Sequence, residues 1–288
     1  MIGGIIGDIV GSVYEGKQWD KRNLELFQTF PFTDVSDVLK NTKWVRTTPG
    51  WTDDSLCTLA LFSAYINKLS PVSELVRCCK KYANDATGFG GNFTKWLDNP
   101  VPYGSYANGS IMRIGFINHL DIPLQDKLDL AYDYTIISHN HEDSTTAVLD
   151  FVRLIEEING LTLAEQKAGI ASYLKAVNWT ETVETLHDKK VFDMNALVTF
   201  KQALTIVLES NSFEEVMKLS CYVGGDTDTI ACVAGNIAEH LWAIPTDLFD
   251  YLFDVFYTDN MEDMELFGLI NLFILQYSTS AVKDKDKK

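Results

Sequence analysis

The chain has 288 residues, of which 46% are hydrophobic and 22% are charged. This composition is typical of a folded protein with a sizeable buried core, and it excludes a disordered or fibrous chain. The net charge of −16 excludes a protein that binds nucleic acid or an anionic membrane through its overall field, because phosphate binding relies on Lys and Arg.

Helical spacing of apolar residues begins at the N-terminus. Isoleucines and valines recur at this spacing over residues 2–13, and Gly7 and Gly11, one turn apart, leave room for a close neighbour. We therefore expect a buried central helix. Similar patterns predict further helices at 55–69, 73–82, 124–137, 144–157, 163–177, 195–209, 213–222 and 229–242. Ser212 and Glu215 could form a capping box for the helix at 213–222.

Three stretches show no sustained helical period. Residues 17–50 predict mostly loop, and residues 87–116, rich in Gly, Pro and aromatic residues, predict irregular backbone that passes close to another group. The charged segment 281–288 is expected to be disordered. Strand-type alternation is nearly absent and no repeat or linker divides the chain. The sequence therefore predicts an all-α fold, a single compact helical domain over residues 1–280.

The sequence also bears on the compartment. The five cysteines form no CxxC pair and are odd in number, which is typical of buried free thiols in a reducing compartment. The N-terminus shows no basic region followed by an apolar run and a cleavage site. We expect neither a signal peptide nor a membrane span, and a cytoplasmic location.

Two acidic motifs stand at predicted helix starts, TDD at 52–54 and DTDT at 226–229. Each alone is explained as a helix cap, because Thr and Asp accept hydrogen bonds from free N–H groups and complement the helix dipole. Together they supply more oxygen atoms than two caps need. If the helix starts meet, these side chains would suit Mg²⁺ or Mn²⁺ rather than zinc, since neither motif contains His or Cys. The six candidate ligands are Thr52, Asp53, Asp54, Asp226, Asp228 and Thr229, while Thr227 is expected to complete the helix start.

Two further carboxylates lie on almost the same face of the first helix, Asp8 and Glu15. Asp8 lies within an apolar run and needs a buried partner, such as a helix N-terminus. Glu15 could be a catalytic carboxylate or a solvated side chain, and its spacing alone favours the solvated side chain. His139 and His141, two residues apart, fit one helical face poorly, so we do not expect them to bind a metal.

Six segments, in order along the chain, resemble motifs of the ADP-ribosylglycohydrolase family. They are GGIIGDIVGSVYEG, WTDDSLCTLAL, GFGGNFTKWL, YANGSIMRIG, SHNHEDSTTAV and GGDTDTIACVAGNIA. The resemblance covers nearly the whole chain except the loop before Trp51 and the C-terminal segment. It implies an all-helical domain with two Mg²⁺ or Mn²⁺ ions in a central cleft. Such a protein would cleave the C1″ glycosidic bond of an ADP-ribosylated protein or small-molecule acceptor and release ADP-ribose.

The resemblance also implies roles for particular residues. Glu15 matches a glutamate to which a catalytic role has been assigned in some branches, and Asp54 is a second candidate for catalysis. The six acidic-motif residues given above match the metal ligands. The residues that match the ADP-ribose-binding loops are Gly90, Gly91, Asn108, Gly109, Ser110, Met112 and His141.

The chain departs from the family pattern at three places. It has Ala107 before Asn108 where Gly is frequent, Glu142 after His141 where Pro is frequent, and Ser105 where some branches carry a carboxylate. The general base, the acceptor and the choice between Mg²⁺ and Mn²⁺ therefore stay open. The alternatives are a hydrolase of another nucleotide-linked ribose, and a protein that binds ADP-ribose without cleaving it or has a structural, crystallin-like role.

Overall fold

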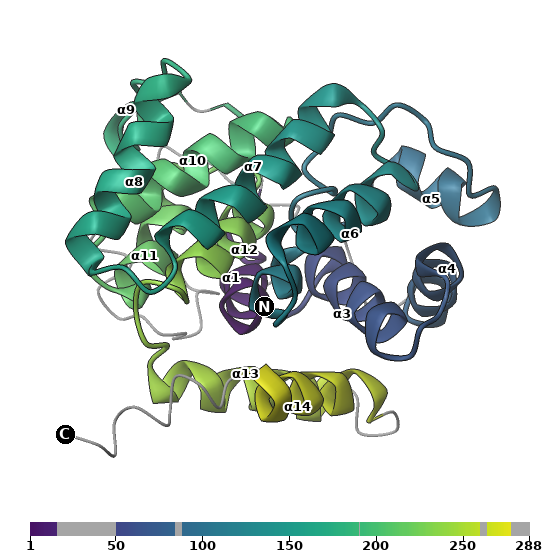
Figure 1. Ribbon diagram of the computed structural model, residues 1–288. Helices are drawn as coiled ribbons and strands as arrows, with labels where there is room; N and C mark the ends of the chain where they lie inside the picture. The colour runs from purple at the N-terminus through teal and green to yellow at the C-terminus, as the bar shows by residue number, and fades with distance from the viewer. Residues whose placement is uncertain (16–49, 84–87, 190, 260–263, 278–288) are drawn as a thin grey trace, which may run out of the picture.

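A computed structural model describes residues 1–15, 50–83, 88–189, 191–259 and 264–277. Two helices, α1 (Ile2–Gly11) and α12 (Thr227–Ala238), lie at the centre of these residues (Figure 1). The surrounding helices are α3 (Asp53–Ile66), α4 (Pro71–Lys81), α5 (Gly91–Asp98), the 3₁₀ helix η3 (Gly115–His119), α6 (Leu124–Ile136), α7 (Glu142–Ile158), α8 (Leu163–Ala176), α9 (Val183–Lys189), α10 (Ala196–Glu209), α11 (Phe213–Val223), α13 (Thr246–Asp259) and α14 (Glu265–Tyr277). The predictions for residues 17–49 and 281–288 lie outside the described residues.

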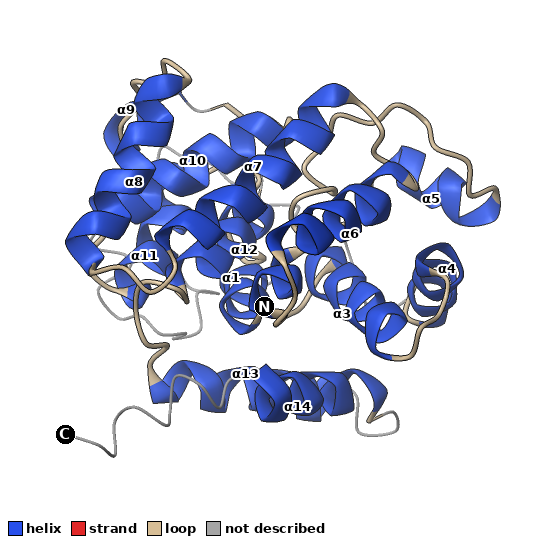
Figure 2. Ribbon diagram, viewed as in Figure 1, coloured by secondary structure: helices blue, strands red, loops and turns tan. Residues whose placement is uncertain are grey.

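The described residues contain no β-sheet (Figure 2), and their one pairing of strand type is an isolated bridge between Ala107 and Asn195. The helices share one hydrophobic core. The all-α, single-domain prediction is therefore confirmed. Among the described helices, none combines the length and the apolar character that a membrane span requires.

Helices α1 and α12 touch through their backbones. A Cβ atom added to Gly7 would lie 2.0 Å from the carbonyl oxygen of Ala231, and one added to Gly11 would lie 2.2 Å from that of Thr227. Both distances are too short for any side chain, so only glycine permits this approach. The expected close neighbour of the first helix is thus α12. Their contact brings the end of α1 beside the start of α12, where the second acidic motif stands.

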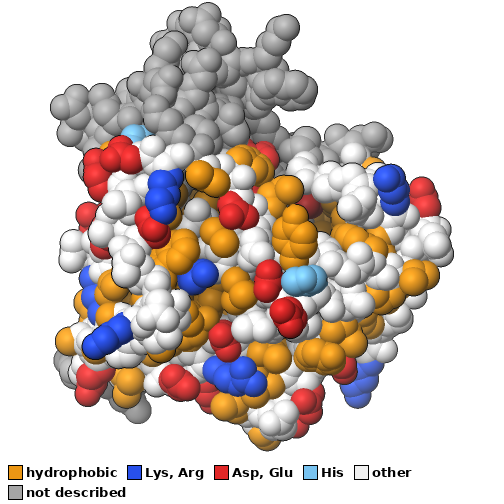
Figure 3. Space-filling model, turned by 90° about the horizontal axis from the view of Figure 1, so that it is seen from above, with side chains coloured by type: hydrophobic (Ala, Val, Ile, Leu, Met, Phe, Trp, Pro, Cys, Tyr) orange, Lys and Arg blue, Asp and Glu red, His pale blue; other side chains and the backbone are white. Residues whose placement is uncertain are grey.

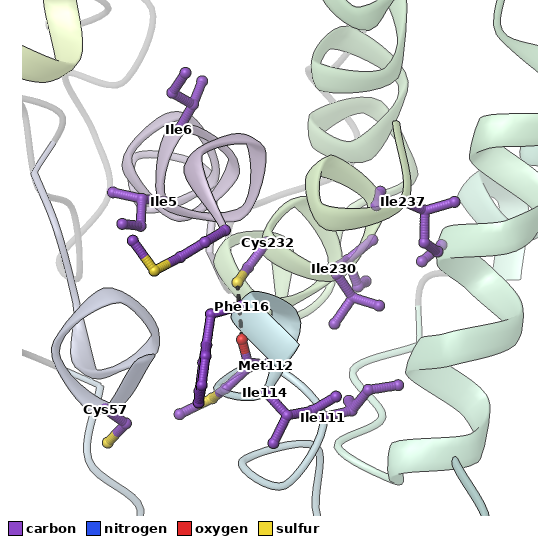
Figure 4. Packing of buried hydrophobic residues seen from close by; sticks show 14 of the residues in the cluster. Ile5, Ile6, Cys57, Ile111, Met112, Ile114, Phe116, Ile230, Cys232 and Ile237 are labelled. Atoms are coloured by element: carbon purple, nitrogen blue, oxygen red, sulfur yellow. Dashed lines mark hydrogen bonds between the residues drawn. The ribbon is translucent and has the colours of Figure 1, made fainter. Parts of the chain in front are cut away.

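A loop that leads into η3 lies against the other side of α12. Figure 4 shows Cys232 of α12 directed at Met112, and its Sγ donates a hydrogen bond of 3.4 Å to the Met112 carbonyl oxygen. Ile111 and Ile114 lie in the same buried cluster as Ile230. This packing fixes the segment that carries most of the predicted ligand-binding residues against the helix that carries the second acidic motif.

All nine predicted helices form, with ends that shift by a few residues. The prediction of irregular backbone over 87–116 is wrong for residues 91–98, which form α5. There Phe93, Trp96 and Leu97 recur at helical spacing and are buried. Helices α9, α13 and α14 are absent from the sequence-based prediction.

The expected capping box at α11 forms only in part. The Ser212 hydroxyl accepts a hydrogen bond of 3.1 Å from the Glu215 backbone N–H, as predicted. The Glu215 carboxylate, however, accepts from the backbone N–H of Asn211 at 2.7 Å rather than from that of Ser212. The glutamate therefore reaches one residue further back than in a full capping box.

Candidate active site

The start of α3 is held by a carboxylate from α1. Asp8 is fully buried and accepts hydrogen bonds from the backbone N–H groups of Thr52 and Ser55, at 2.9 and 3.0 Å, and from both of their hydroxyl groups. Asp8 is therefore hydrogen-bonded to a helix N-terminus, the kind of partner that a buried carboxylate requires. The Thr52 side chain also accepts from the Asp54 backbone N–H at 3.3 Å. As a result, the first acidic motif is anchored to the central helix.

Two glycines precede α12, and the carboxylate at its N-cap position does not cap the helix. Gly224 and Gly225 have φ angles of 79° and 80°, in the left-handed region that favours glycine. Asp226 occupies the N-cap position but makes no capping hydrogen bond with its side chain. Its carboxylate instead accepts a hydrogen bond of 2.7 Å from Asn108 Nδ2. Thr227 donates to the Gly11 carbonyl oxygen at 2.8 Å, so its side chain fastens α12 to α1 rather than completing the helix start.

The two helix starts meet. Thr229 Oγ1 of α12 donates a hydrogen bond of 3.2 Å to Asp54 Oδ2 of α3. Oxygen atoms of Asp8, Asp54 and Asp228 lie within 4.8 Å of one another, and so do oxygen atoms of Glu15, Asp226 and Asp228. Asp228 thus belongs to both groups. The structure brings together the two motifs that the sequence could place only at separate helix starts.

The meeting point opens into a cavity of about 230 Å³. Five of the six candidate metal ligands line it, as does Glu15; these ligands are Asp53, Asp54, Asp226, Asp228 and Thr229. Thr52 does not line the cavity, because its hydroxyl donates to Asp8 behind the helix start. Gly88, with a φ of 103°, closes over Asp53, since a Cβ there would lie 2.2 Å from Asp53 Oδ1.

The site carries more buried negative charge than its own side chains balance. Burial raises the pKa of the Asp53, Asp54 and Asp228 carboxyl groups well above their usual range, and repulsion from neighbouring carboxylates raises these pKa values further. Burial also raises the pKa of Asp226, an effect that the hydrogen bond from Asn108 opposes. Asp54 Oδ1 is buried without a hydrogen-bond partner. Clustered carboxylates with an unpartnered oxygen fit a hard divalent cation such as Mg²⁺ or Mn²⁺.

Another part of the cavity wall consists of loops and the start of α5. Five of the predicted ligand-binding residues line it, namely Gly90, Gly91, Asn108, Gly109 and Met112. Asn108 Nδ2 also donates to Thr199 Oγ1 of α10 at 3.2 Å, so the amide is fixed between two helices. Because small residues allow close approach of the backbone, this wall can contact a bound ligand through peptide groups.

Two predicted ligand-binding residues are not part of this wall. Ser110 is fully buried, and its hydroxyl donates to the Ala107 carbonyl oxygen at 2.9 Å. His141 is the N-cap of α7, where its Nδ1 accepts from the Asp143 N–H at 3.1 Å. Its ring packs edge-on against Tyr106, 5.8 Å away, outside the residues that line the cavity.

Some cavity residues have no signal in the sequence. Phe192 and Met194 reach the site because the loop before α10 pairs with the segment at 106–108, where the Asn108 N–H donates to the Met194 carbonyl oxygen at 2.7 Å. His139 and Arg113 also line the cavity. The motifs that contain His139 and Arg113 are visible in the sequence, but which of their side chains face a ligand depends on tertiary packing.

Surface charge is mixed on the face seen from above. Figure 3 shows Lys and Arg side chains scattered singly among acidic and hydrophobic ones, with no basic patch gathered among the described residues of that face. This face therefore offers no concentrated positive field for a polyanion.

Comparison with known proteins places these features in a family. Residues 1–276 match the profile of the ADP-ribosylglycohydrolase family. The chain is 24% identical over 272 residues to the ADP-ribosylarginine hydrolase Tri1 of Pseudomonas putida (strain GB-1), covering 85% of this chain and 70% of the relative. A solved structure described as an ADP-ribosylglycohydrolase-related protein complex superimposes with a TM-score of 0.61 at 19% identity, covering 93% of this chain and 95% of the other. The superposition shows a shared fold.

Proposed function

Because the chain belongs to the ADP-ribosylglycohydrolase family, we propose that it is a metal-dependent hydrolase that cleaves the bond between C1″ of ADP-ribose and an acceptor. The family acts on ADP-ribosylated substrates. One observation carries the proposal for this chain: two acidic helix starts meet at one cavity, through the hydrogen bond from Thr229 to Asp54.

The acidic wall would hold two Mg²⁺ or Mn²⁺ ions. The ligands would be Asp53, Asp54, Asp226, Asp228 and Thr229, all of which line the cavity. When bound, such ions polarise substrate oxygens and lower the pKa of a coordinated water. Thr52 would position the first acidic motif instead of binding a metal ion. Its hydroxyl donates to Asp8, and its side chain lies outside the cavity lining.

The chain's own carboxylates would serve the reaction in two ways. Glycosidic cleavage passes through an oxocarbenium-like transition state, whose positive charge the surrounding carboxylates would stabilise. Glu15 would accept a proton from the attacking water through a carboxylate oxygen, because that oxygen lies within 4.8 Å of oxygens of Asp226 and Asp228. Asp54, whose Oδ2 is fixed by Thr229, is the second candidate for orienting the water.

The loops and the start of α5 in the cavity wall would bind the ADP-ribosyl group. Gly90, Gly91 and Gly109 would bring peptide groups close to it, and Asn108 would fix the loop to Asp226. Phe192 and Met194 would cover the ligand with apolar surface, since both side chains are partly exposed beside the cavity.

A product assay tests the proposal. Proteins ADP-ribosylated at arginine, serine or acidic residues, and nucleic acids ADP-ribosylated at their ends, are incubated with the enzyme and Mg²⁺ or Mn²⁺, and free ADP-ribose is measured by chromatography. Arginine comes first because the Pseudomonas putida relative is an ADP-ribosylarginine hydrolase. We expect release from at least one substrate, and its loss in Asp228→Asn but not in Asp121→Asn, which changes an exposed carboxylate outside the site.

The negative outcomes are also informative. Absence of free ADP-ribose with every substrate would contradict the proposed hydrolysis. If ADP-ribose nevertheless bound to the protein in calorimetry, the chain would be a binding module. If it did not bind, the result would favour a structural, crystallin-like role.

A further inference from the structure

A buried arginine lies in the cavity wall. Arg113 is fully buried, and in the described part of the chain it forms no ion pair. Its Nη2 donates to the carbonyl oxygen of Tyr134, in the last turn of α6, at 3.1 Å, and to Ser138 Oγ at 2.9 Å. The first bond caps the helix C-terminus, where a positive charge is favourable. The second bond fixes a serine that follows α6.

The bond from Arg113 determines where the Ser138 proton points. A guanidinium only donates, so Ser138 Oγ accepts from it and must place its single proton elsewhere. Ser138 is fully buried, which leaves no bulk water for that proton. Among the described residues, the other hydrogen-bond neighbour of Ser138 Oγ is His139 Nδ1, at 2.8 Å. The hydroxyl therefore donates to Nδ1, and Nδ1 must be unprotonated.

The opposite ring nitrogen faces the cavity. His139 lines the cavity, and a Cβ added to Gly109 would lie 2.9 Å from His139 Nε2. Nε2 takes part in no hydrogen bond among the described residues. Burial holds the pKa of His139 well below its usual range, and the positive charge of Arg113 lowers it further. The titratable side chain of Tyr103 also packs near this ring, with 5.8 Å between the ring centroids.

We propose that Arg113 and Ser138 are positioning residues that lock His139 as a neutral imidazole with its proton on Nε2, and that this N–H donates a hydrogen bond to an oxygen of the bound ADP-ribosyl group beside Gly109. The second half rests on the proposed function, whereas the tautomer is a property of the free protein. A neutral donor suits the site because a second cation beside Arg113 would be costly to bury.

The first test observes the tautomer in the wild-type protein. In the full chain with Mg²⁺, labelled histidine nitrogens are observed by NMR, and His139 is assigned from the signals lost in His139→Gln. We expect Nδ1 to resonate as an unprotonated nitrogen and Nε2 as a protonated one, with no titration between pH 6 and pH 8. A proton on Nδ1, or protonation of both nitrogens in this range, would overturn the proposal whether or not the protein hydrolyses anything.

The second test uses matched replacements. A Gln side chain places its amide N–H₂ near the position of His Nε2, while that of Asn is one carbon shorter and stops short of the ligand. We expect His139→Gln to bind ADP-ribose within about twofold of the wild type and His139→Asn to bind about fivefold to tenfold more weakly, as for the loss of one hydrogen bond. Wild-type affinity in both variants would contradict the predicted donor. ADP measured in parallel locates the acceptor, because equal weakening places it on the part that the two ligands share.

The third test addresses the positioning residues. Ser138→Ala removes the hydroxyl that donates a hydrogen bond to Nδ1, so we expect a mixture of His139 tautomers and weaker ADP-ribose binding. Ser138→Thr keeps the hydroxyl and should restore the single tautomer and the wild-type affinity. A His139 spectrum in Ser138→Ala identical to that of the wild type would refute the role of Ser138. Arg113→Met, which keeps an extended side chain but removes its donors, should show the same tautomer mixture, and circular dichroism verifies that each variant folds.

Discussion

Thr229 on α12 donates a hydrogen bond of 3.2 Å to Asp54 on α3, although the two residues are 175 positions apart in the sequence. This contact connects two helix starts, each of which, alone, would be an ordinary capped terminus. The contact lies in the wall of the cavity. It fixes Oδ2 of Asp54, while Oδ1 is buried without a hydrogen-bond partner. The proposed metal site depends on this alignment.

Removing the Thr229 hydroxyl should therefore weaken metal binding. We predict that Thr229→Val lowers the affinity for Mn²⁺ about tenfold or more, as for other changes that disturb the orientation of metal ligands. Thr229→Ser, which keeps the hydroxyl, should stay close to the wild type. Calorimetric titration with Mn²⁺ gives the affinity of each protein. Equal affinity in all three would show that this hydroxyl neither binds the metal ion nor orients Asp54.

Metal binding should stabilise the fold. At a free metal concentration about 100 times the dissociation constant, binding to the folded state alone adds about 2.7 kcal/mol to the free energy of unfolding. We predict this gain for Mn²⁺ or Mg²⁺ in urea unfolding, its reversal by a chelator, and its absence in Asp228→Asn. If neither ion at millimolar concentration changed the urea midpoint of unfolding, the protein would lack the proposed site.

The contact between α1 and α12 should tolerate no side chain at its centre. Gly7→Ala would place a Cβ 2.0 Å from the Ala231 carbonyl oxygen, so the helices would have to separate, at a cost of about 1–3 kcal/mol or more. Gly268, in α14, has open space around its Cβ position, and Gly268→Ala should be neutral or stabilising by up to about 1 kcal/mol. Urea unfolding of the two variants compares them, and similar stabilities would argue against the backbone contact.

His240 should make stability depend on pH in one direction. Burial, together with the nearby His119, whose ring stacks at 4.7 Å, lowers the pKa of His240 to about 3. In the unfolded chain the imidazole has its ordinary pKa near 6.5, so between about pH 6.5 and 3 the unfolded state binds a proton that the folded state does not. The contribution of His240 to stability is therefore lost as pH falls through 6.5.

Replacement of His240 isolates this effect from the titration of the acidic site. We predict that the wild type loses stability relative to His240→Asn as pH falls from 7 to 4, by at most about 1.4 kcal/mol per pH unit. Urea unfolding of both proteins in the same buffers gives the difference. A difference that is constant with pH would mean that the imidazole is not shielded in the folded protein.

Sequence alone was sufficient for the features with a local signature. Apolar spacing located the central helix, and Gly7 and Gly11 predicted its close neighbour. The carboxylates at 53–54 and 226–228 exceeded what two caps use, and this excess predicted a shared metal site on the condition that the two helix starts meet. Asp8, isolated among apolar residues, predicted a helix N-terminus as its partner. For the carboxylates, the residues conflicted with their immediate surroundings, and the conflict had few physical solutions.

Other features depend on directions that a sequence does not contain. Thr52 and Ser110 belong to the right motifs, yet both hydroxyls bond inside the protein. His141 caps α7, whereas its neighbour His139 lines the cavity, although the two share one motif. Helix α5 was missed because two glycines precede it and prolines follow, which together are typical of a loop.

The most direct test of the central claim is the release of ADP-ribose from an ADP-ribosylated substrate with Mn²⁺ or Mg²⁺, with a chelator, and with Asp228→Asn in place of the wild type. Asp228 contributes oxygens to both carboxylate groups of the site, so its neutralisation disturbs both at once. We predict release that requires the metal ion and falls by at least about a hundredfold in the variant. Release that persists unchanged in the chelator and in Asp228→Asn would contradict an active site built from the two helix starts.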